Sequence, residues 1–160
     1  MSIDRVRDYF RGFDMEEKIL EFSVSSATVE LAAQAVGVIP ARIAKSLTFM
    51  LPEGPIIIVA AGDARIDNPR FKAQYHTKAK MLTAEEVTGR IGHNVGGVCP
   101  FAIMDDVKVY LDESMKRFET VYPACGSSNS AIELTPEELE KVAQNFVGWV
   151  DVCKGWREEA

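Results

Sequence analysis

The spacing of apolar positions and the start and stop signals around them predict several short helices. Apolar residues recur every three to four positions near the N-terminus, which predicts an amphipathic helix over residues 3–12 that ends at Gly12. Capping residues and prolines in the first turn mark the other starts. The predicted helices run from Thr28 to Gly37, over the short turn 40–44, from Asn68 onward, from Thr83 to Gly89, and from about 136 to 147 after the cap Thr135.

Apolar runs and alternating patterns predict the strands. Leu47–Leu51 and Ile56–Ala61 flank the sequence PEGP, which predicts a hairpin. Residues 107–111 and 118–122 alternate between apolar and polar, as half-buried strands do. Residues 18–24 and 131–134 read as two further short strands. Five or six strands with helices between them and one tight hairpin predict a mixed sheet, in the α/β or α+β class.

Two segments fit neither period and are expected to be shaped loops. The first is RIGHNVGGVCPF, residues 90–101, which holds three glycines and a proline. The second is the CGSSNS turn, residues 125–130, inside a longer segment of small residues, 122–134. No internal repeat, low-complexity stretch or long linker interrupts the pattern. A single domain over residues 1–160 is therefore expected.

Composition is that of an ordinary globular domain, with 160 residues of which 47% are hydrophobic and 26% charged. The longest purely apolar stretch, Ile56–Ala61, is far too short to span a membrane, and the N-terminus lacks the apolar core of a signal peptide. We therefore expect a cytoplasmic protein. Three widely spaced cysteines and two histidines suit neither a disulfide framework nor a zinc site. No metal and no cofactor are expected.

The net charge of −6 argues against a broad nucleic-acid footprint, but the charge is unevenly distributed. Residues 63–80 hold five cations and two anions, whereas residues 112–160 hold ten acids and five bases. A small basic patch could hold one end of a nucleic acid, or it could be a solvated surface. The candidates for phosphate contacts are Arg65, Lys72, Lys78 and Lys80.

Three segments carry candidate chemistry. Lys45 lies in ARIAKSLTF, where a turn is expected to pass into a buried strand, so its ammonium either reaches solvent or occupies a pocket with a partner. The loop Gly96–Pro100 can present backbone N–H groups to a carbonyl oxygen or a phosphate, because adjacent glycines allow close approach. The small residues of 122–134 could form the wall of a pocket that admits only small groups.

Together these segments resemble the YbaK/prolyl-tRNA-synthetase-associated domain family, the free-standing relatives of an editing domain of bacterial prolyl-tRNA synthetase. The resemblance rests on IAKSL, GGVCPF and VYPACG followed by IELTPEEL, and covers about residues 25–143. It implies an α/β fold with a mixed, curved, barrel-like sheet surrounded by helices. It also implies hydrolysis of the ester in a misacylated tRNA, usually tRNA(Pro), with an aminoacyl-tRNA synthetase as a possible further partner.

The resemblance also implies roles for matched residues. Lys45 would be the essential lysine, Gly96 and Pro100 would be the ends of a GxxxP loop with Gly97 inside it, and Gly126 matches a glycine of the third motif. Neighbouring residues are expected to bind the substrate: Ser46, Val98, Cys99, Gly126 and Ser127. Members that resemble cysteinyl-tRNA(Pro) deacylases carry a serine and an aspartate where this chain has Ala124 and Ala131. Cysteine as the amino acid removed is therefore in doubt.

An aminoacyl ester is already activated, so its hydrolysis needs positioning and carbonyl polarisation more than a protein nucleophile. We expect Lys45 to meet the tRNA 3′ end or the ester carbonyl while the Gly96–Pro100 amides hold that carbonyl. Two alternatives stay open. A non-catalytic module could bind an amino acid or aminoacyl-nucleotide at the same pocket, and a cysteine hydrolase could use Cys99 with His93.

Overall fold

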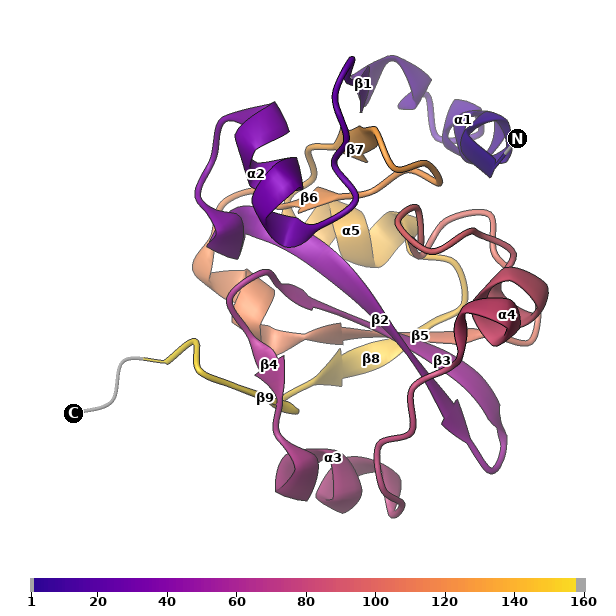
Figure 1. The fold of residues 1–160 in the computed structure, drawn as a ribbon, viewed down its shortest axis with the longest axis vertical. Helices are drawn as coiled ribbons and strands as arrows, with labels where there is room; N and C mark the ends of the chain where they lie inside the picture. The colour runs from indigo at the N-terminus through magenta and orange to yellow at the C-terminus, as the bar shows by residue number, and fades with distance from the viewer. Residues whose placement is uncertain (1, 158–160) are drawn as a thin grey trace.

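A twisted five-stranded sheet forms the centre of the protein, in a computed structural model that describes residues 2–157 (Figure 1). The strand order is β6-β2-β3-β5-β8, with β2 (Ile43–Leu51) antiparallel to β3 (Gly54–Ala61) and the other three pairs parallel. The remaining strands are β5 (Lys108–Asp112), β6 (Tyr122–Pro123) and β8 (Phe146–Val150). The predicted mixed sheet and the predicted hairpin are therefore confirmed.

Two small antiparallel pairs flank this sheet. In one, β1 (Ile19–Glu21) pairs with β7 (Ser130–Ile132), and in the other β4 (Arg65–Ile66) pairs with β9 (Cys153–Lys154). The apolar run of β3 lies in the middle of the core, with Ile57 to Ala61 fully buried. A strand with neighbours on both sides and helices on its faces must be apolar along its whole length, and this explains the unbroken run.

Helices and helical turns surround the sheet. The α-helices are α1 (Ser2–Arg11), α2 (Val29–Val36), α3 (Asn68–Tyr75), α4 (Ala84–Glu86) and α5 (Pro136–Val142). Shorter turns are η1 (Glu16–Lys18), η2 (Pro40–Arg42), η3 (Val87–Ile91) and η4 (Glu113–Arg117). Capping boxes at Thr83 and Thr135, and the left-handed Gly37 (φ 86°) after α2, confirm the local signals at these ends.

Five predicted segments have other boundaries in the structure. The last helix ends at Val142 instead of 147, because Asn145 (φ 55°) turns the chain and donates to the carbonyl oxygens of Asp105 and Val107 before β8 begins. The helix after Thr83 continues as a π-turn past Gly89 to Ile91. Residues 43–44 belong to β2 rather than to a helical turn. In segments 18–24 and 118–122 only Ile19–Glu21 and Tyr122 are in strands.

The N-terminal helix packs on the loops at one end of the sheet. The rings of Phe10 and Phe101 lie 4.6 Å apart, and Val6 is fully buried against Gly126. Arg5 donates to the carbonyl oxygen of Gly92. Helix α1 therefore supports both of the irregular loops predicted from the sequence.

Trp149 and Trp156 are half-buried and pack on the core. Within residues 2–157, no helix is both long and apolar enough to cross a membrane. The same residues contain no cluster of three His, Cys, Asp or Glu side chains suited to a metal ion.

Candidate functional site

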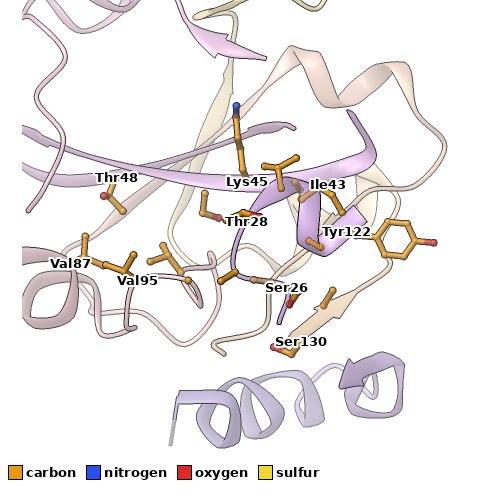
Figure 2. Close-up of a pocket in the computed structure, with 18 of the residues that line it drawn as sticks. Ser26, Thr28, Ile43, Lys45, Thr48, Val87, Val95, Tyr122 and Ser130 are labelled. Carbon is orange, nitrogen blue, oxygen red and sulfur yellow. The ribbon is translucent and has the colours of Figure 1, made fainter. Parts of the chain in front are cut away.

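A cavity of about 410 Å³ lies between β2, helix α2 and the glycine-rich loop (Figure 2). Most of the side chains that line it are small or carry a hydroxyl. Among the described residues, Lys45 is the one charged residue in this lining. The lining residues are Ser26, Ala27, Thr28, Val29, Ala32, Ile43, Ala44, Lys45, Ser46, Thr48, Met81, Leu82, Ala84, Val87, Val95, Gly96, Val98, Tyr122, Ala124, Ser130 and Ala131. A cavity of this size is at the small end of the range for ligand sites.

Two hydroxyls in this lining have no protein partner. Ser26 is 7% exposed, and the Oγ atoms of Ser26 and Ser46 are buried without a hydrogen bond. Ser26 is held by its backbone N–H, which donates to the carbonyl oxygen of Ser128 at 2.6 Å. A buried polar group without a partner costs free energy, which a hydrogen-bonding ligand would recover. Both hydroxyls therefore favour a polar ligand in the cavity.

The glycine-rich loop packs so closely against the small-residue turn that Gly97 has no room for a side chain. A Cβ on Gly97 would lie 2.6 Å from the carbonyl carbon of Gly126 and 2.7 Å from the N atom of Ser127. Gly96 adopts φ 97° and faces the cavity, and the carbonyl of Pro100 accepts a hydrogen bond from the Gln144 N–H at 2.8 Å. The structure thus brings two of the three predicted segments together.

Lys45 lies at the edge of this cavity, but its ammonium does not point toward the glycine loop. Figure 2 shows the side chain on the opposite side of β2 from Ser26, Thr28 and Val95. The Nζ atom donates to the carbonyl oxygen of Gly62 at 3.4 Å. The expectation that this ammonium and the loop converge on one point is corrected, because side chains alternate across a strand.

Partial burial lowers the pKa of Lys45, and the nearby charges of Asp63 and Glu30 oppose that shift.

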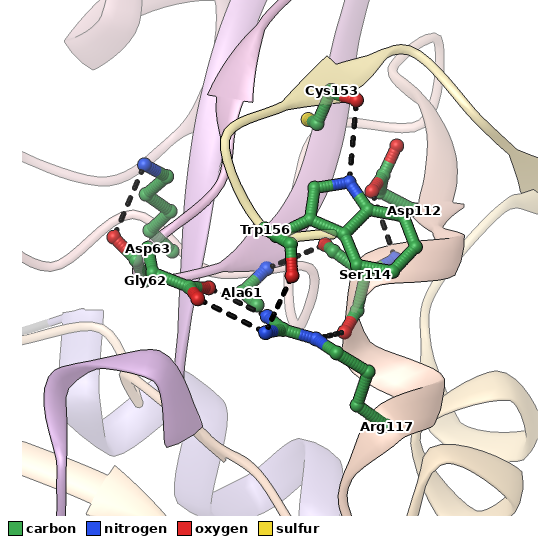
Figure 3. A network of polar contacts seen from close by, with 9 residues as sticks. Ala61, Gly62, Asp63, Asp112, Ser114, Arg117, Cys153 and Trp156 are labelled. Atoms are coloured by element: carbon green, nitrogen blue, oxygen red, sulfur yellow. Dashed lines mark hydrogen bonds and ion pairs between the residues drawn. The ribbon is translucent and has the colours of Figure 1, made fainter. Parts of the chain in front are cut away.

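A polar network holds the backbone that Lys45 contacts (Figure 3). Arg117 forms a bidentate ion pair with Asp63, at 2.6 and 3.0 Å, and also donates to the carbonyl oxygens of Ser114 and Trp156. Gly62 itself leaves no room for a side chain, since a Cβ there would lie 2.0 Å from the carbonyl oxygen of Pro40. The position of the Gly62 carbonyl is therefore set by packing on one side and by Arg117 on the other.

Cys99 and His93 do form a pair, but it is buried away from the cavity. The Sγ of Cys99 lies 3.5 Å from the Nε2 of His93, and that same nitrogen contacts the carbonyl oxygen of Phe101 at 2.7 Å. Cys99 is fully buried, which raises its pKa to about 12, and burial also lowers the pKa of His93. A neutral, inaccessible thiol is a poor nucleophile, so this geometry disfavours the cysteine hydrolase alternative.

The predicted site residues separate into two groups. Lys45, Ser46, Gly96 and Val98 line the cavity, whereas Gly97, Cys99, Pro100, Gly126 and Ser127 are not part of its lining. Ser127 contacts the lining indirectly. Its hydroxyl donates to the Oγ of Ser130 at 2.7 Å, and Ser130 lines the cavity. The structure therefore places Cys99, Gly126 and Ser127 outside this lining, and their contact with the substrate stays a prediction.

Other lining residues were not predicted as site residues. Thr28 was identified only as a helix cap, and Ser26 and Thr48 gave no signal of their own. Because side chains alternate between the two faces of a strand, Thr48 lies on the same face of β2 as Ser46, and the sequence could have shown this. No comparable signal exists for Ser26, because the loop before α2 reaches the cavity through tertiary packing.

The predicted basic residues lie on the surface and outside the lining of this cavity. Arg65 is on β4, Lys72 is on α3, and Lys78 and Lys80 are in the segment between α3 and α4; all four are exposed. Within residues 2–157 none of these four side chains makes a hydrogen bond or an ion pair, whereas Arg7, Arg11, Arg42, Arg70, Arg90 and Arg117 are all paired with acids.

The fold is thus a mixed sheet with a small cavity beside a glycine-rich loop, and comparison with known proteins shows the family to which it belongs. The model of the aminoacyl-tRNA editing domain family matches residues 24–142. The chain belongs to this family, as its motifs predicted.

Individual proteins show the same relationship. The chain is 54% identical over 158 residues to "Uncharacterized protein YwhH" of Bacillus subtilis, covering 98% of this chain and 99% of that protein. It is 27% identical over 120 residues to the "Putative Cys-tRNA(Pro)/Cys-tRNA(Cys) deacylase EbsC" of Enterococcus faecalis, covering 74% of this chain and 73% of that one. A solved structure titled "Crystal structure of a putative trans-editing enzyme for prolyl tRNA synthetase" superimposes with a TM-score of 0.84 at 28% identity, covering 96% and 98% of the two chains.

Proposed function

We propose that this protein is a free-standing deacylase that hydrolyses the ester of a misacylated tRNA, with tRNA(Pro) carrying a small wrong amino acid as its substrate. The observation that carries the proposal is the 410 Å³ cavity, in which Gly96 and Lys45 border two unpaired buried hydroxyls. Family membership supports an aminoacyl-tRNA as the substrate class. The names of the relatives with a stated role support the choice of tRNA(Pro).

The reaction divides between the loop and the lysine. The oxygen of a water molecule attacks the ester carbonyl carbon, and the bond to the esterified ribose oxygen breaks. Attack by the vicinal ribose hydroxyl would only move the acyl group to that hydroxyl, so it does not by itself release the amino acid. Negative charge collects first on the carbonyl oxygen and then on the leaving ribose oxygen, which takes up a proton. Backbone N–H groups of the Gly96 loop stabilise the first charge, and such a donor contributes roughly 3–4 kcal/mol to the barrier reduction.

Lys45 acts from the open edge of the cavity in this scheme. Its hydrogen bond to Gly62 is long, at 3.4 Å, and its flexible stem can carry the ammonium to the ribose or to the adjoining phosphate. Because Lys45 is the one cation in the described lining, its removal takes away the positive charge that this lining can bring to the substrate. Lys45 is therefore the residue on which turnover depends most.

Selection by size follows from the lining. A synthetase pocket gains only about 1–3 kcal/mol per methylene group and cannot exclude smaller amino acids, so a second site that admits only small ones is needed. Ala124 and Ala131 give this cavity small walls without a carboxylate, and Ser26 and Ser46 offer hydroxyls. A small side chain that accepts or donates a hydrogen bond suits this lining.

The test is a deacylation panel with purified protein and tRNA(Pro) charged with alanine, cysteine, serine, threonine or proline. We expect release of at least one small amino acid and little release of proline. The variant Lys45→Ala should retain the fold and lose turnover, whereas Lys141→Ala, at an exposed lysine on α5 without an ion pair, should match wild type. Calorimetric binding of a free amino acid without release from any charged tRNA would instead establish a non-catalytic binding module.

A further inference from the structure

A second cavity, of about 360 Å³, lies on the other side of β2 from the first. Its lining residues are Lys45, Leu47, Phe49, Arg65, Ile66, Asn68, Ala79 and Met81. Lys45 and Met81 line both cavities. We call this second cavity the β4 groove, after the strand that carries Arg65. The two cavities therefore meet at the edge of β2, where Lys45 stands.

The edge of β2 is open at the point where they meet. Along this edge β2 pairs with β6 only at Ile43 and Ala44. Farther along, the Leu82 N–H donates to the Thr48 carbonyl at 3.3 Å, and the Met50 N–H donates to the Lys80 carbonyl at 2.8 Å. Between these contacts, Lys45 to Leu47 have no strand neighbour on this side among residues 2–157. A substrate can therefore pass over this edge from one cavity to the other.

The β4 groove combines an apolar floor with a basic rim. Leu47, Ile66 and Ala79 are half-buried in it, and Met81 is 59% exposed. The Met81 thioether and the aliphatic side chains beside it form an apolar surface on which an aromatic ring, such as a nucleobase, can pack. This floor differs from the hydroxyl-rich lining of the first cavity and suits a different part of a ligand.

Four exposed cations lie in the groove or next to its lining residues. Arg65 lines the groove, Lys154 is opposite Arg65 in the β4–β9 pair, and Lys78 and Lys80 flank Ala79 in the chain. Within the described residues none of these four side chains makes a hydrogen bond or an ion pair, in a protein of net charge −6. Unpaired cations along an apolar groove are the pattern of single-stranded nucleic-acid sites, where bases stack and phosphates meet Lys and Arg.

We propose that the β4 groove binds the unpaired nucleotides that precede the terminal adenosine of an acylated RNA 3′ end. The proposal rests on the proposed function, which places the aminoacyl group in the first cavity. The terminal ribose then lies near Lys45, the bases lie over Leu47 and Met81, and Arg65 contacts a phosphate. The groove contributes binding energy and alignment, not chemistry.

The test compares two substrates that share one ester. One is the complete aminoacyl-tRNA that wild type hydrolyses fastest, and the other is the same amino acid esterified to adenosine alone. Arg65→Glu and Ala79→Glu, at two residues that line the groove and not the first cavity, should raise KM for the aminoacyl-tRNA at least tenfold and leave turnover of the aminoacyl-adenosine unchanged. Lys141→Glu makes a comparable change of charge on α5 and should change neither value more than twofold. Equal KM values for both groove variants and wild type on the tRNA would overturn the proposal, as would equal losses on both substrates.

A binding measurement separates this proposal from the proposed function. A fluorescent, uncharged RNA oligonucleotide ending in CCA should bind wild type, and Arg65→Glu should weaken that binding at least tenfold and flatten its dependence on salt by about one unit of slope. If no charged tRNA is hydrolysed yet this binding is seen, the proposed function fails and the groove stands. If hydrolysis occurs and the oligonucleotide binds Arg65→Glu as tightly as wild type, the groove fails and the proposed function stands.

Discussion

Gly97 packs directly on Gly126, at a distance that leaves no space for a methyl group on Gly97. This contact joins the glycine-rich loop to the small-residue turn, and helix α1 presses on Gly126 from the other side through Val6. The wall of the candidate site therefore consists of two loops locked together, with an N-terminal helix behind them. The family model begins after that helix, at residue 24, so part of the support for the site lies outside the matched segment.

The contact predicts a large effect of Gly97→Ala. The new methyl group would force the two loops apart, which should lower the free energy of unfolding by about 1–3 kcal/mol and move the Gly96 amide from its position. We expect kcat/KM for deacylation to fall at least tenfold. Gly89→Ala is the matched control, because nothing lies within 4 Å of a Cβ there. Chemical denaturation and deacylation assays check both variants, and wild-type activity in Gly97→Ala would show that the loop contact does not position the site.

Ser46 predicts a separation of activity from stability. Its Oγ is buried without a partner, so Ser46→Ala should leave the free energy of unfolding unchanged or slightly raised, while kcat/KM falls about tenfold through loss of a substrate hydrogen bond. Ser114 gives the contrast, because its hydroxyl accepts from the Ala61 N–H at 3.1 Å in the core. Ser114→Ala should cost roughly 1–3 kcal/mol of stability. A stability loss in Ser46→Ala equal to that of Ser114→Ala would assign Ser46 a purely structural role.

The lowered pKa of Lys45 predicts a pH dependence of stability. Between the folded and unfolded pKa values of this lysine, the unfolded chain binds more protons, so stability gains with rising pH through that window. Lys45→Met removes this contribution. The difference in free energy of unfolding, wild type minus Lys45→Met, should therefore increase as the pH rises toward the ordinary lysine value near 10.4. Urea denaturation at several pH values measures it, and a flat or falling difference would contradict the shift.

Cys99 predicts resistance to thiol reagents. Complete burial raises its pKa to about 12, so the thiol is protonated and covered at neutral pH. Labelling by a soluble disulfide reagent should need unfolding of the protein, and the rate should follow the denaturant concentration. Cys99→Ala should keep its deacylation rate, because the thiol lies outside the cavity, although the lost packing lowers stability. Loss of activity with retained fold in this variant would return the cysteine mechanism to consideration.

Much of the architecture follows from local signals in the chain. Thr28 and Gly37 delimit α2, the capping boxes start α4 and α5, and the two apolar runs around PEGP form the central hairpin, because each of these signals acts over a few neighbouring residues. The end of α5 did not follow, since it depends on Asn145 bonding to the carbonyls of residues 105 and 107, some forty positions away. Boundaries set by distant partners have no local signal.

The candidate site divides in the same way. Residue type along the chain was sufficient to select Lys45 and the Gly96 loop as candidates, because a lysine in a buried strand and adjacent glycines are visible in the local sequence. The family followed from the resemblance of three motifs taken in order, and the family model confirms it. The direction of the Lys45 ammonium, the place of Ser26 and the burial of Cys99 depended on how β2, α2 and the loops pack together. All three depend on contacts between segments that are far apart in the chain. These contacts form only when the core packs and fixes which face of each strand is buried.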